Sequence, residues 1–257
     1  MIIRDTFTSA RTYYVRTDGS DSNNGLSNTA AGAFLTIQKA VDTVCDTIDN
    51  MGYAVTIQVA DGAYNAPVTL RPYVGRGTVT LQGNTTTPSN VTITTSSGHA
   101  INAVCGDQSW SLKGFKISTT GANSYGILIT SSKLSFANID FGSCASGHIA
   151  SDKAANVAAS GSYTISGGAP FHIISYNSII DIRNRSVTLT GTPAFSSVFA
   201  AATLAGVLWA DGATFTGTAT GARYNSIQNS IIHTNGGGSN FFPGNIAGTT
   251  QTGGLYV

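Results

Sequence analysis

The segments Tyr163-Thr164-Ile165-Ser166-Gly167 and Val187-Thr188-Leu189-Thr190-Gly191 lie 24 positions apart and share one alternation of apolar and polar side chains. The same alternation recurs at further steps of 24 positions toward the N-terminus. A period of two is typical of a strand with one buried face. The first apolar column contains Val91, Phe115, Ile139, Tyr163 and Val187, the second contains Ile93, Ile117, Phe141, Ile165 and Leu189, and the polar column between them contains Thr92, Lys116, Asp140, Thr164 and Thr188.

This repeat determines the expected fold class. About three short strands fit into one step, so each strand can pair with its equivalent one step further along the chain. Antiparallel hairpins would not place equivalent positions above one another at a constant long step. The sequence therefore predicts an all-β protein, a single-stranded right-handed parallel β-helix of about seven coils. A third inward column is expected at Ile101, Tyr125, Ile149 and Ile173.

Four regions are expected along the chain. Residues 1–12 form an N-terminal arm, and residues 13–52 form a cap. Within this cap, apolar residues recur at helical spacing after Thr36, which is a suitable N-cap, so an amphipathic helix is expected to cover the first coil. Residues 53–220 form the parallel β-helix. Residues 221–257 lose the repeat, are rich in glycine and are expected to form a C-terminal cap or assembly tail.

The composition argues against several classes of protein. The chain has 13 Lys and Arg residues against 12 acidic residues, all of them Asp, and its net charge is +1. Nucleic-acid binding is not expected, because contacts with phosphates need an excess of basic residues. No apolar run is long enough to predict a membrane span. The widely spaced Cys45, Cys105 and Cys144 indicate small buried residues rather than a metal site, and no metal or cofactor is expected.

The first residues do not resemble a signal peptide, because Arg4 and Asp5 interrupt the region where an apolar core would stand. The chain is therefore expected to fold in a reducing cytoplasm. Its surface is nevertheless expected to be rich in Ser, Thr, Asn and Gly, a composition that is usual outside cells. A location in a virion that is released by lysis reconciles these two expectations.

Both ends of the chain resemble known β-helix proteins. The stretches Tyr14–Leu26 and Phe34–Val41 are similar to the opening of right-handed β-helix proteins of the pectate-lyase-like superfamily, common in phage tail spikes and other particle-surface proteins. The stretches Asn235–Gly238, Phe242–Gly244 and Gly253–Tyr256 resemble the ends of β-helix proteins of phages and prophages. The resemblance implies a homotrimer that binds other virion proteins of the capsid or tail. Family members include lyases, hydrolases, receptor-binding spikes and inert structural proteins, so the resemblance leaves the activity open.

A polysaccharide-cleaving enzyme of this fold would need carboxylates or histidines gathered on one outward face. His148 and His172 are 24 positions apart and each precedes an inward Ile, so the two are expected to stack outward. A surface ladder or a subunit contact explains them better than catalysis does. Asp140 is better explained by a solvated ion pair with Lys116. The weak catalytic candidates are Asp140, Asp181, Asp211, His148 and His172.

Sugar binding and assembly have their own candidate residues. The run Asp181-Ile182-Arg183-Asn184-Arg185 is the densest charge group, and an Arg fork can bind a sugar carboxylate, although a salt bridge or a subunit contact fits better. Trp209 fits a sugar platform, a core position or an interface. The glycan-binding candidates are Tyr176, Arg183, Arg185 and Trp209. The assembly candidates are Phe241, Phe242, Pro243 and Tyr256, and the two Phe rings are expected to be buried against a partner.

The favoured function is a non-catalytic structural protein on the surface of a phage or phage-like particle. It would be a tail-spike or fibre component or a capsid decoration protein, and binding of host surface polysaccharide is a further expectation. The alternative is a polysaccharide depolymerase of the tail-spike type, either a lyase or a glycoside hydrolase. Head or tail placement stays open at this stage.

Overall fold

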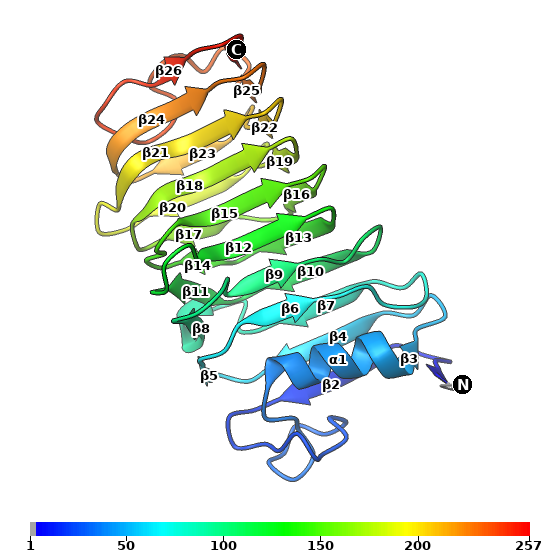
Figure 1. The fold of residues 1–257 in the computed structure, drawn as a ribbon. Helices are drawn as coiled ribbons and strands as arrows, with labels where there is room; N and C mark the ends of the chain where they lie inside the picture. The colour runs from blue at the N-terminus through cyan, green and yellow to red at the C-terminus, as the bar shows by residue number, and fades with distance from the viewer. Residues whose placement is uncertain (1–3) are drawn as a thin grey trace.

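The computed structural model of the chain describes residues 4–257 and is a parallel β-helix of about eight turns (Figure 1). The strand pairs within these residues are parallel, as the repeat predicts. The number of turns is slightly larger than the expected value of about seven, because strands continue beyond residue 220. One α-helix lies at the N-terminal end (Figure 1).

Three sheets wrap around one interior, and from β4 to β24 the chain passes from sheet 1 to sheet 2 to sheet 3 in each turn. Sheet 1 contains β2 (Arg11–Val15), β4 (Val55–Val59), β7 (Val79–Gln82), β10 (Ser109–Lys113), β13 (Lys133–Ala137), β16 (Asn156–Ala159), β19 (Ile179–Asp181), β22 (Val207–Trp209), β25 (Ile231–His233) and β27 (Leu255–Tyr256). Sheet 2 contains β5 (Gly62–Tyr64), β8 (Val91–Thr95), β11 (Lys116–Thr119), β14 (Asp140–Phe141), β17 (Tyr163–Ile165), β20 (Ser186–Leu189) and β23 (Thr214–Thr216). Sheet 3 contains β6 (Val68–Leu70), β9 (Ile101–Ala103), β12 (Tyr125–Thr130), β15 (Gly147–Asp152), β18 (Ala169–Tyr176), β21 (Ala194–Thr203), β24 (Thr220–Ser226) and β26 (Thr249–Thr250).

The predicted columns of sheet 2 are confirmed. Ile93, Ile117 and Phe141 occupy paired positions on β8, β11 and β14, and none of the three is exposed. The column continues to Ile165 and Leu189 on β17 and β20. The hydrogen bonds of a parallel ladder join each strand to its equivalent in the next turn, so equivalent side chains lie above one another.

The third predicted column differs from the structure at one position. Ile127, and not Tyr125, is paired with Ile101 and with Ile149. Tyr125 faces outward and packs with a small apolar cluster outside the interior. The number of residues between paired positions is larger than the regular period from β9 to β12 and smaller from β12 to β15. A constant period therefore selects the wrong residue on β12.

The interior is filled by apolar side chains, with large aromatic rings in its middle turns. Trp110, Phe115 and Phe136 are fully buried. The rings of Phe136 and Phe141 meet edge to face with centroids 6.0 Å apart. Burial of each large apolar side chain contributes about 1.5–3 kcal/mol relative to exposure. The continuous stack is therefore the main source of stability.

Tight corners separate sheet 1 from sheet 2. Gly114 has a φ of 75° and Asn138 has a φ of 52°, and each lies between consecutive strands of the two sheets. Glycine and asparagine adopt this left-handed conformation more readily than other residues. These two residues therefore allow the chain to bend sharply between the two sheets.

The predicted cap helix is confirmed as α1 (Ile37–Thr47). The Thr36 hydroxyl accepts a hydrogen bond from the backbone nitrogen of Lys39 at 3.2 Å, which caps the first turn. The apolar spacing predicts that Ile48 extends the helix, but this residue begins β3 (Ile48–Asp49) instead. The apolar face of α1 packs into the core at the N-terminal end, and its buried residues are Ile37, Ala40, Val41, Val44 and Cys45.

Much of the predicted N-terminal arm belongs to the folded body. Residues 1–3 lie outside the described part of the chain. β1 (Asp5–Thr6) pairs with β3, Phe7 is buried, and β2 already begins at Arg11.

The chain beyond residue 220 continues the β-helix, although the sequence predicts that the repeat ends there. Asn225 pairs with Thr249, and Ile231 pairs with Leu255, so both pairs keep the regular period. The period is hard to recognise in the sequence because these last strands are short and are separated by a long Gly-rich loop.

The expectation that Phe242 needs a partner for burial is wrong. Phe242 is 1% exposed within its own chain and packs against Phe199 and Phe215, with centroids 5.9 and 5.6 Å away. Phe241 and Pro243 are half-buried beside it, because the loop after β25 folds over the last turn.

Tyr256 is likewise held within the chain. Its ring stacks on Tyr224 at a centroid distance of 3.7 Å, and its hydroxyl donates to the Gly238 carbonyl at 2.8 Å. Together, the four assembly candidates close the C-terminal end of the interior.

A substitution of Phe141 tests the stacked interior. Phe141→Ala is expected to lower the free energy of unfolding by about 3–5 kcal/mol, because neighbouring turns cannot fill the cavity left by a fully buried ring. Thr188→Ala removes an exposed outward side chain of the same sheet and is expected to change that free energy by less than about 0.5 kcal/mol. Urea denaturation followed by circular dichroism measures both. Equal effects would contradict the stacked core.

Candidate functional site

The outward side of sheet 1 carries a cluster of charged and aromatic residues near the C-terminal end of the β-helix. Asp181, Trp209 and His233 occupy paired positions on β19, β22 and β25, so they form one outward column. Arg183 comes two residues after Asp181, and Asp211 comes two residues after Trp209. Both lie beside this column. We call these five residues the Trp209 cluster. It brings together four of the predicted site residues.

The alternation of the strand explains why Trp209 faces outward. Its neighbours Leu208 and Ala210 are fully buried, so the residue between them points to the opposite side of the sheet. The Arg183 guanidinium lies over the indole, 5.4 Å from its centroid, and the centroid of the His233 ring is 4.8 Å away. The half-buried indole is therefore fixed by contacts with the turns on both sides of it.

Asp181 is held as a carboxylate. Arg183 donates to it from Nε at 3.0 Å and from Nη2 at 2.6 Å, and the Arg183 backbone nitrogen donates at 2.9 Å. Partial burial opposes ionisation, but these hydrogen bonds and the positive charge prevail and lower the pKa of Asp181. A carboxyl group with a lowered pKa is not a proton donor near neutral pH, so Asp181 is unsuited to general-acid catalysis.

Asp211 and His233 face each other without a close hydrogen bond. His233 Nδ1 and Asp211 Oδ1 are 3.6 Å apart, and neither atom has a hydrogen-bond partner within residues 4–257. The side chains of His233 and Asp211 are 31% and 30% exposed. Such a pair can orient the imidazole ring for a hydrogen bond or a proton transfer to a bound molecule.

The Trp209 cluster combines the groups that sugar recognition requires. An aromatic ring can pack against the apolar face of a sugar, while carboxylate, guanidinium and imidazole groups hydrogen-bond to hydroxyls. A glycosidase needs one carboxyl group that gives up a proton and a second that acts as base or nucleophile. Asp181 and Asp211 are the two carboxylates present, and Asp181 is already bound by Arg183. The arrangement is therefore better suited to binding than to hydrolysis.

Two predicted glycan-binding residues are not part of this cluster. The Nε of Arg185 donates to the Ala159 carbonyl at 2.8 Å, which turns its head group toward the backbone. Tyr176 lies on sheet 3, beside the outward apolar cluster that also contains Tyr125. Tyr176 and Trp209 are on different sheets, so they do not form one platform.

Asp140 lies on sheet 2 and forms the predicted ion pair. Its Oδ2 is 3.1 Å from Lys116 Nζ, which also donates to the Ser166 hydroxyl at 3.1 Å. The pair is not solvated as expected, because Asp140 is only 9% exposed, and its Oδ1 has no hydrogen-bond partner within the described chain. The residues paired with Asp140 are Lys116 and Thr164, so no second carboxylate accompanies it in the ladder.

His148 and His172 are buried in the interior, and the prediction of an outward pair is wrong. Neither side chain is exposed. Their Nδ1 atoms are 3.1 Å apart, and His172 Nε2 is 3.0 Å from the Tyr163 hydroxyl. Each histidine is followed by a buried Ile, Ile149 or Ile173, so the strand has two consecutive inward residues at this position and the period of two fails. Buried in this way, the pair cannot contact a substrate.

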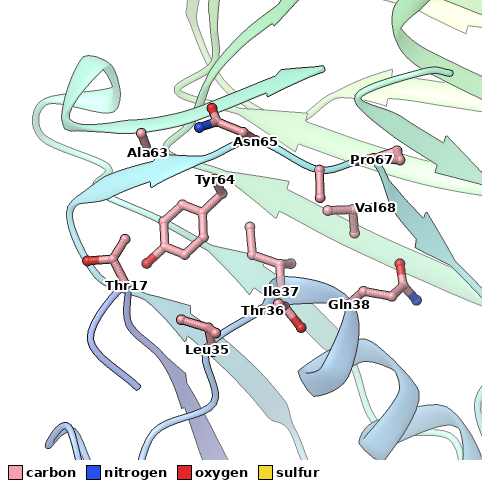
Figure 2. A pocket seen from close by; sticks show the side chains of 11 residues that line it. Thr17, Leu35, Thr36, Ile37, Gln38, Ala63, Tyr64, Asn65, Pro67 and Val68 are labelled. Carbon is pink, nitrogen blue, oxygen red and sulfur yellow. The ribbon is translucent and has the colours of Figure 1, made fainter. Parts of the chain in front are cut away.

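A separate hollow of about 190 Å³ lies between the start of α1 and the first turn (Figure 2). The Tyr64 ring and Ile37 lie at its centre, with Thr17 and Leu35 to one side (Figure 2). The Tyr64 hydroxyl already donates to the Ala60 carbonyl at 2.9 Å. The lining is mainly apolar, and the Tyr64 hydroxyl is already hydrogen-bonded. We therefore interpret this hollow as a packing gap between the cap and the β-helix and not as a binding site.

Other site chemistry is limited within residues 4–257. No group of three His, Cys, Asp or Glu residues gathers there as a metal site. Cys45, Cys105 and Cys144 are buried and unpaired, and burial raises the pKa of Cys45 to about 11 and that of Cys105 to about 12. In the same part of the chain, no helix has the length and apolar character needed to cross a membrane.

The sequence prediction omits His233. This residue lies 24 positions after Trp209, so the repeat itself places the two in one column. Asp181 and Trp209 are paired although they are 28 positions apart, and a constant period does not identify that step.

No protein-family model matches the sequence, and no curated protein matches it. Among solved structures, the chain is similar to the pectin methylesterase from Aspergillus niger in penultimately deglycosylated form, with a TM-score of 0.60 and 16% identity over 100% of this chain and 86% of that chain. The deglycosylated form of that protein gives a TM-score of 0.52 and 17% identity over the same shares. These likenesses show a shared β-helix fold, as the resemblance of the chain ends predicts.

The free energy of unfolding is expected to fall as the pH drops below about 6.5. Burial lowers the pKa of His148 from 6.5 to about 3, and burial together with the nearby His148 lowers the pKa of His172. The unfolded chain therefore binds protons that the folded chain does not, so stability that is fully present above pH 6.5 is lost on acidification. The loss at pH 5.5 is about 1 kcal/mol for each histidine, measured by urea denaturation at pH 7.5 and 5.5.

A triple variant is the control for this pH dependence. His148→Phe, His172→Phe and Tyr163→Phe together remove the buried polar network, and Phe199 already fills the next inward position after His172 in β21. The variant is expected to lose less stability than the wild type over the same pH interval. An equal loss in both proteins would show that the pair does not cause the dependence.

Proposed function

We propose that the protein is a polysaccharide-binding β-helix that holds a sugar chain on the outward side of sheet 1, at the Trp209 cluster. The observation that carries this proposal is the half-buried indole of Trp209, fixed between Arg183 and His233 and flanked by the carboxylates of Asp181 and Asp211. A rigid aromatic surface with polar groups at its edge suits the apolar face and the hydroxyl groups of a sugar.

The charges of the site favour a neutral or weakly charged glycan. Asp181 and Asp211 offset Arg183 and the nearby Arg185, and the whole chain has a net charge of only +1. Arg183 is further engaged by two hydrogen bonds to Asp181. A dense polyanion would meet no surplus of positive charge here, so recognition relies on hydroxyl groups and on stacking.

The likeness to solved structures supports a carbohydrate ligand. Both similar structures are of a pectin methylesterase, named for a polysaccharide substrate, and they share this fold. The depolymerase alternative would depend on Asp211 and His233. Asp181 is neutralised by its ion pair with Arg183. Asp140 lies on another sheet, and His148 and His172 are buried. The proposal is therefore binding without cleavage.

Binding to immobilised polysaccharides tests this function. We expect retention on galactan or dextran, which are neutral, to exceed retention on polygalacturonate, and to persist at high salt. Trp209→Ala is expected to weaken binding about tenfold, which corresponds to about 1.4 kcal/mol of stacking and hydrogen bonding. Arg76→Ala is the matched control, because it removes an exposed arginine outside the cluster that forms no ion pair in residues 4–257.

The same samples distinguish binding from cleavage. No release of reducing ends is expected from any of these polysaccharides. Release that Asp211→Asn abolishes would establish the depolymerase instead. Absence of binding to both neutral polysaccharides would refute the proposed function.

A structural role on the surface of a phage-like particle is the second candidate function, and the two roles are compatible. The chain ends resemble particle-surface proteins, and the outward side of sheet 3 carries an apolar cluster that suits packing against other proteins. The half-buried members that a partner protein would contact are Tyr125, Leu128, Phe171, Tyr176 and Ala222, whereas Ile174 and Val198 are buried within the chain.

This second role predicts a homotrimer and association with virion proteins. Light scattering is expected to give three times the mass of one chain, and the protein is expected to co-sediment with particles. A monomer that stays in the supernatant would contradict the particle-surface role without affecting the binding of glycans.

A further inference from the structure

We infer that the glycan-binding surface extends along sheet 1 to a second subsite near its N-terminal end, where side-chain amides bind the hydroxyl groups of a neutral sugar unit. This inference rests on the proposed function. The subsite is a hollow of about 360 Å³ on the outward side of β4 and β7, flanked by the N-terminal loop. We call it the amide pocket, and its polar lining residues are Asn28, Gln58, Asp61, Gln82, Asn84 and Thr85.

The amides of this pocket are held in place by the β-helix itself. Gln82 Nε2 donates to Gln58 Oε1 at 3.0 Å, one turn away. Gln58 Nε2 in turn donates to the carbonyls of Val59 and Gly83, both at 3.3 Å. This chain of hydrogen bonds fixes both side chains before a ligand arrives. Preorganised groups lose less conformational freedom on binding and therefore contribute more to affinity.

Free hydrogen-bonding atoms remain on both sides of the hollow. Within residues 4–257, Gln82 Oε1 accepts no hydrogen bond, and Asn28 Nδ2 donates none. Asn28 Oδ1 is occupied by Arg16 Nη1 at 3.2 Å, which orients the amide. A hydroxyl group is both donor and acceptor, so it suits a site with a free carbonyl oxygen and a free amide nitrogen.

The lining of the pocket indicates an uncharged ligand. Asp61 carries its only charge, and it accepts hydrogen bonds from Asn84 Nδ2 at 3.0 Å and Asn90 Nδ2 at 2.9 Å. No Lys or Arg lines the hollow, although Lys113 is paired with Gln82 one turn further along. A sugar acid would be repelled by Asp61, whereas a neutral sugar can donate hydroxyl hydrogens to its carboxylate.

The amide pocket and the Trp209 cluster lie on the same side of one sheet. In the outward column, Thr80 on β7 and Asp181 on β19 are joined through three small residues, Ser111, Ser135 and Ala158, each paired with the next. These strands follow one another along the axis of the β-helix (Figure 1). In this column the surface between the two subsites is therefore lined by short side chains, and Lys113 lies beside it in the column of Gln82.

The spacing of the strands matches a polymer laid along the axis. Four strand steps of about 4.8 Å separate β7 from β19, and five separate it from β22, which carries Trp209, so the distance is roughly 19 to 24 Å. One step is close to the length of one sugar unit in an extended chain, so a chain of about five units reaches from one subsite to the other. Shorter fragments can occupy only one subsite at a time.

Calorimetric titration with fragments of defined length tests this inference. The probes are fragments of three and of eight units prepared from galactan and from dextran. The double variant Asn28→Ala/Gln82→Ala is expected to bind the eight-unit fragment about fivefold more weakly than the wild type, because it loses about one net hydrogen bond. It is expected to bind the three-unit fragment as tightly as the wild type does. Trp209→Ala is expected to weaken binding of both lengths.

The control variant is Gln251→Ala, which removes an exposed glutamine whose side chain forms no hydrogen bond in the described chain. It is expected to bind both fragments as the wild type does. If the double variant binds eight-unit fragments with wild-type affinity while Trp209→Ala does not, the second subsite is wrong and the proposed function stands. If the wild type binds neither fragment of either polysaccharide, both proposals fail. Thermal denaturation verifies that each variant is folded.

Discussion

Parallel backbone hydrogen bonds between consecutive turns fix the positions of the strand side chains in this protein. Each strand pairs with its equivalent in the next turn, as Ile117 does with Ile93 below it and Phe141 above it. The register that stacks these apolar residues inside also aligns the outward residues between them, because side chains alternate across a strand. The core and the proposed binding surface therefore depend on the same ladder. A slip of one residue in any turn would bury polar side chains and expose apolar ones.

The sequence alone predicts the parts of the fold where the repeat is regular. The repeat predicts the middle of sheet 2, from β8 to β20, residue by residue, and Thr36 marks the start of α1. The prediction fails where connections vary in length, as at Tyr125, and where a strand has two consecutive inward residues, as at His148. It also fails at Phe242, because whether a terminal ring packs on its own chain is a property of tertiary structure.

The sequence predicts the composition of the candidate site but not its arrangement. The sequence analysis names four members of the site as candidates: Asp181, Arg183, Trp209 and Asp211. It does not predict that Trp209 is paired with Asp181, because longer connections in that turn lengthen the step between them. His233 can be found from the sequence, because it keeps the regular period after Trp209. The amide pocket cannot be found from the sequence, because Asn28 comes from a loop outside the repeat. Long-range placement of loops is not encoded in a local period.

Because the strands all run parallel, the rod has no symmetry that exchanges its two ends. Glutamine and asparagine mark one end of sheet 1, and tryptophan, arginine and histidine mark the other. Polysaccharide chains are also directional, with a reducing and a non-reducing terminus. A polymer bound along this surface would therefore have a single preferred orientation, and its reducing terminus would always point toward the same end of the protein.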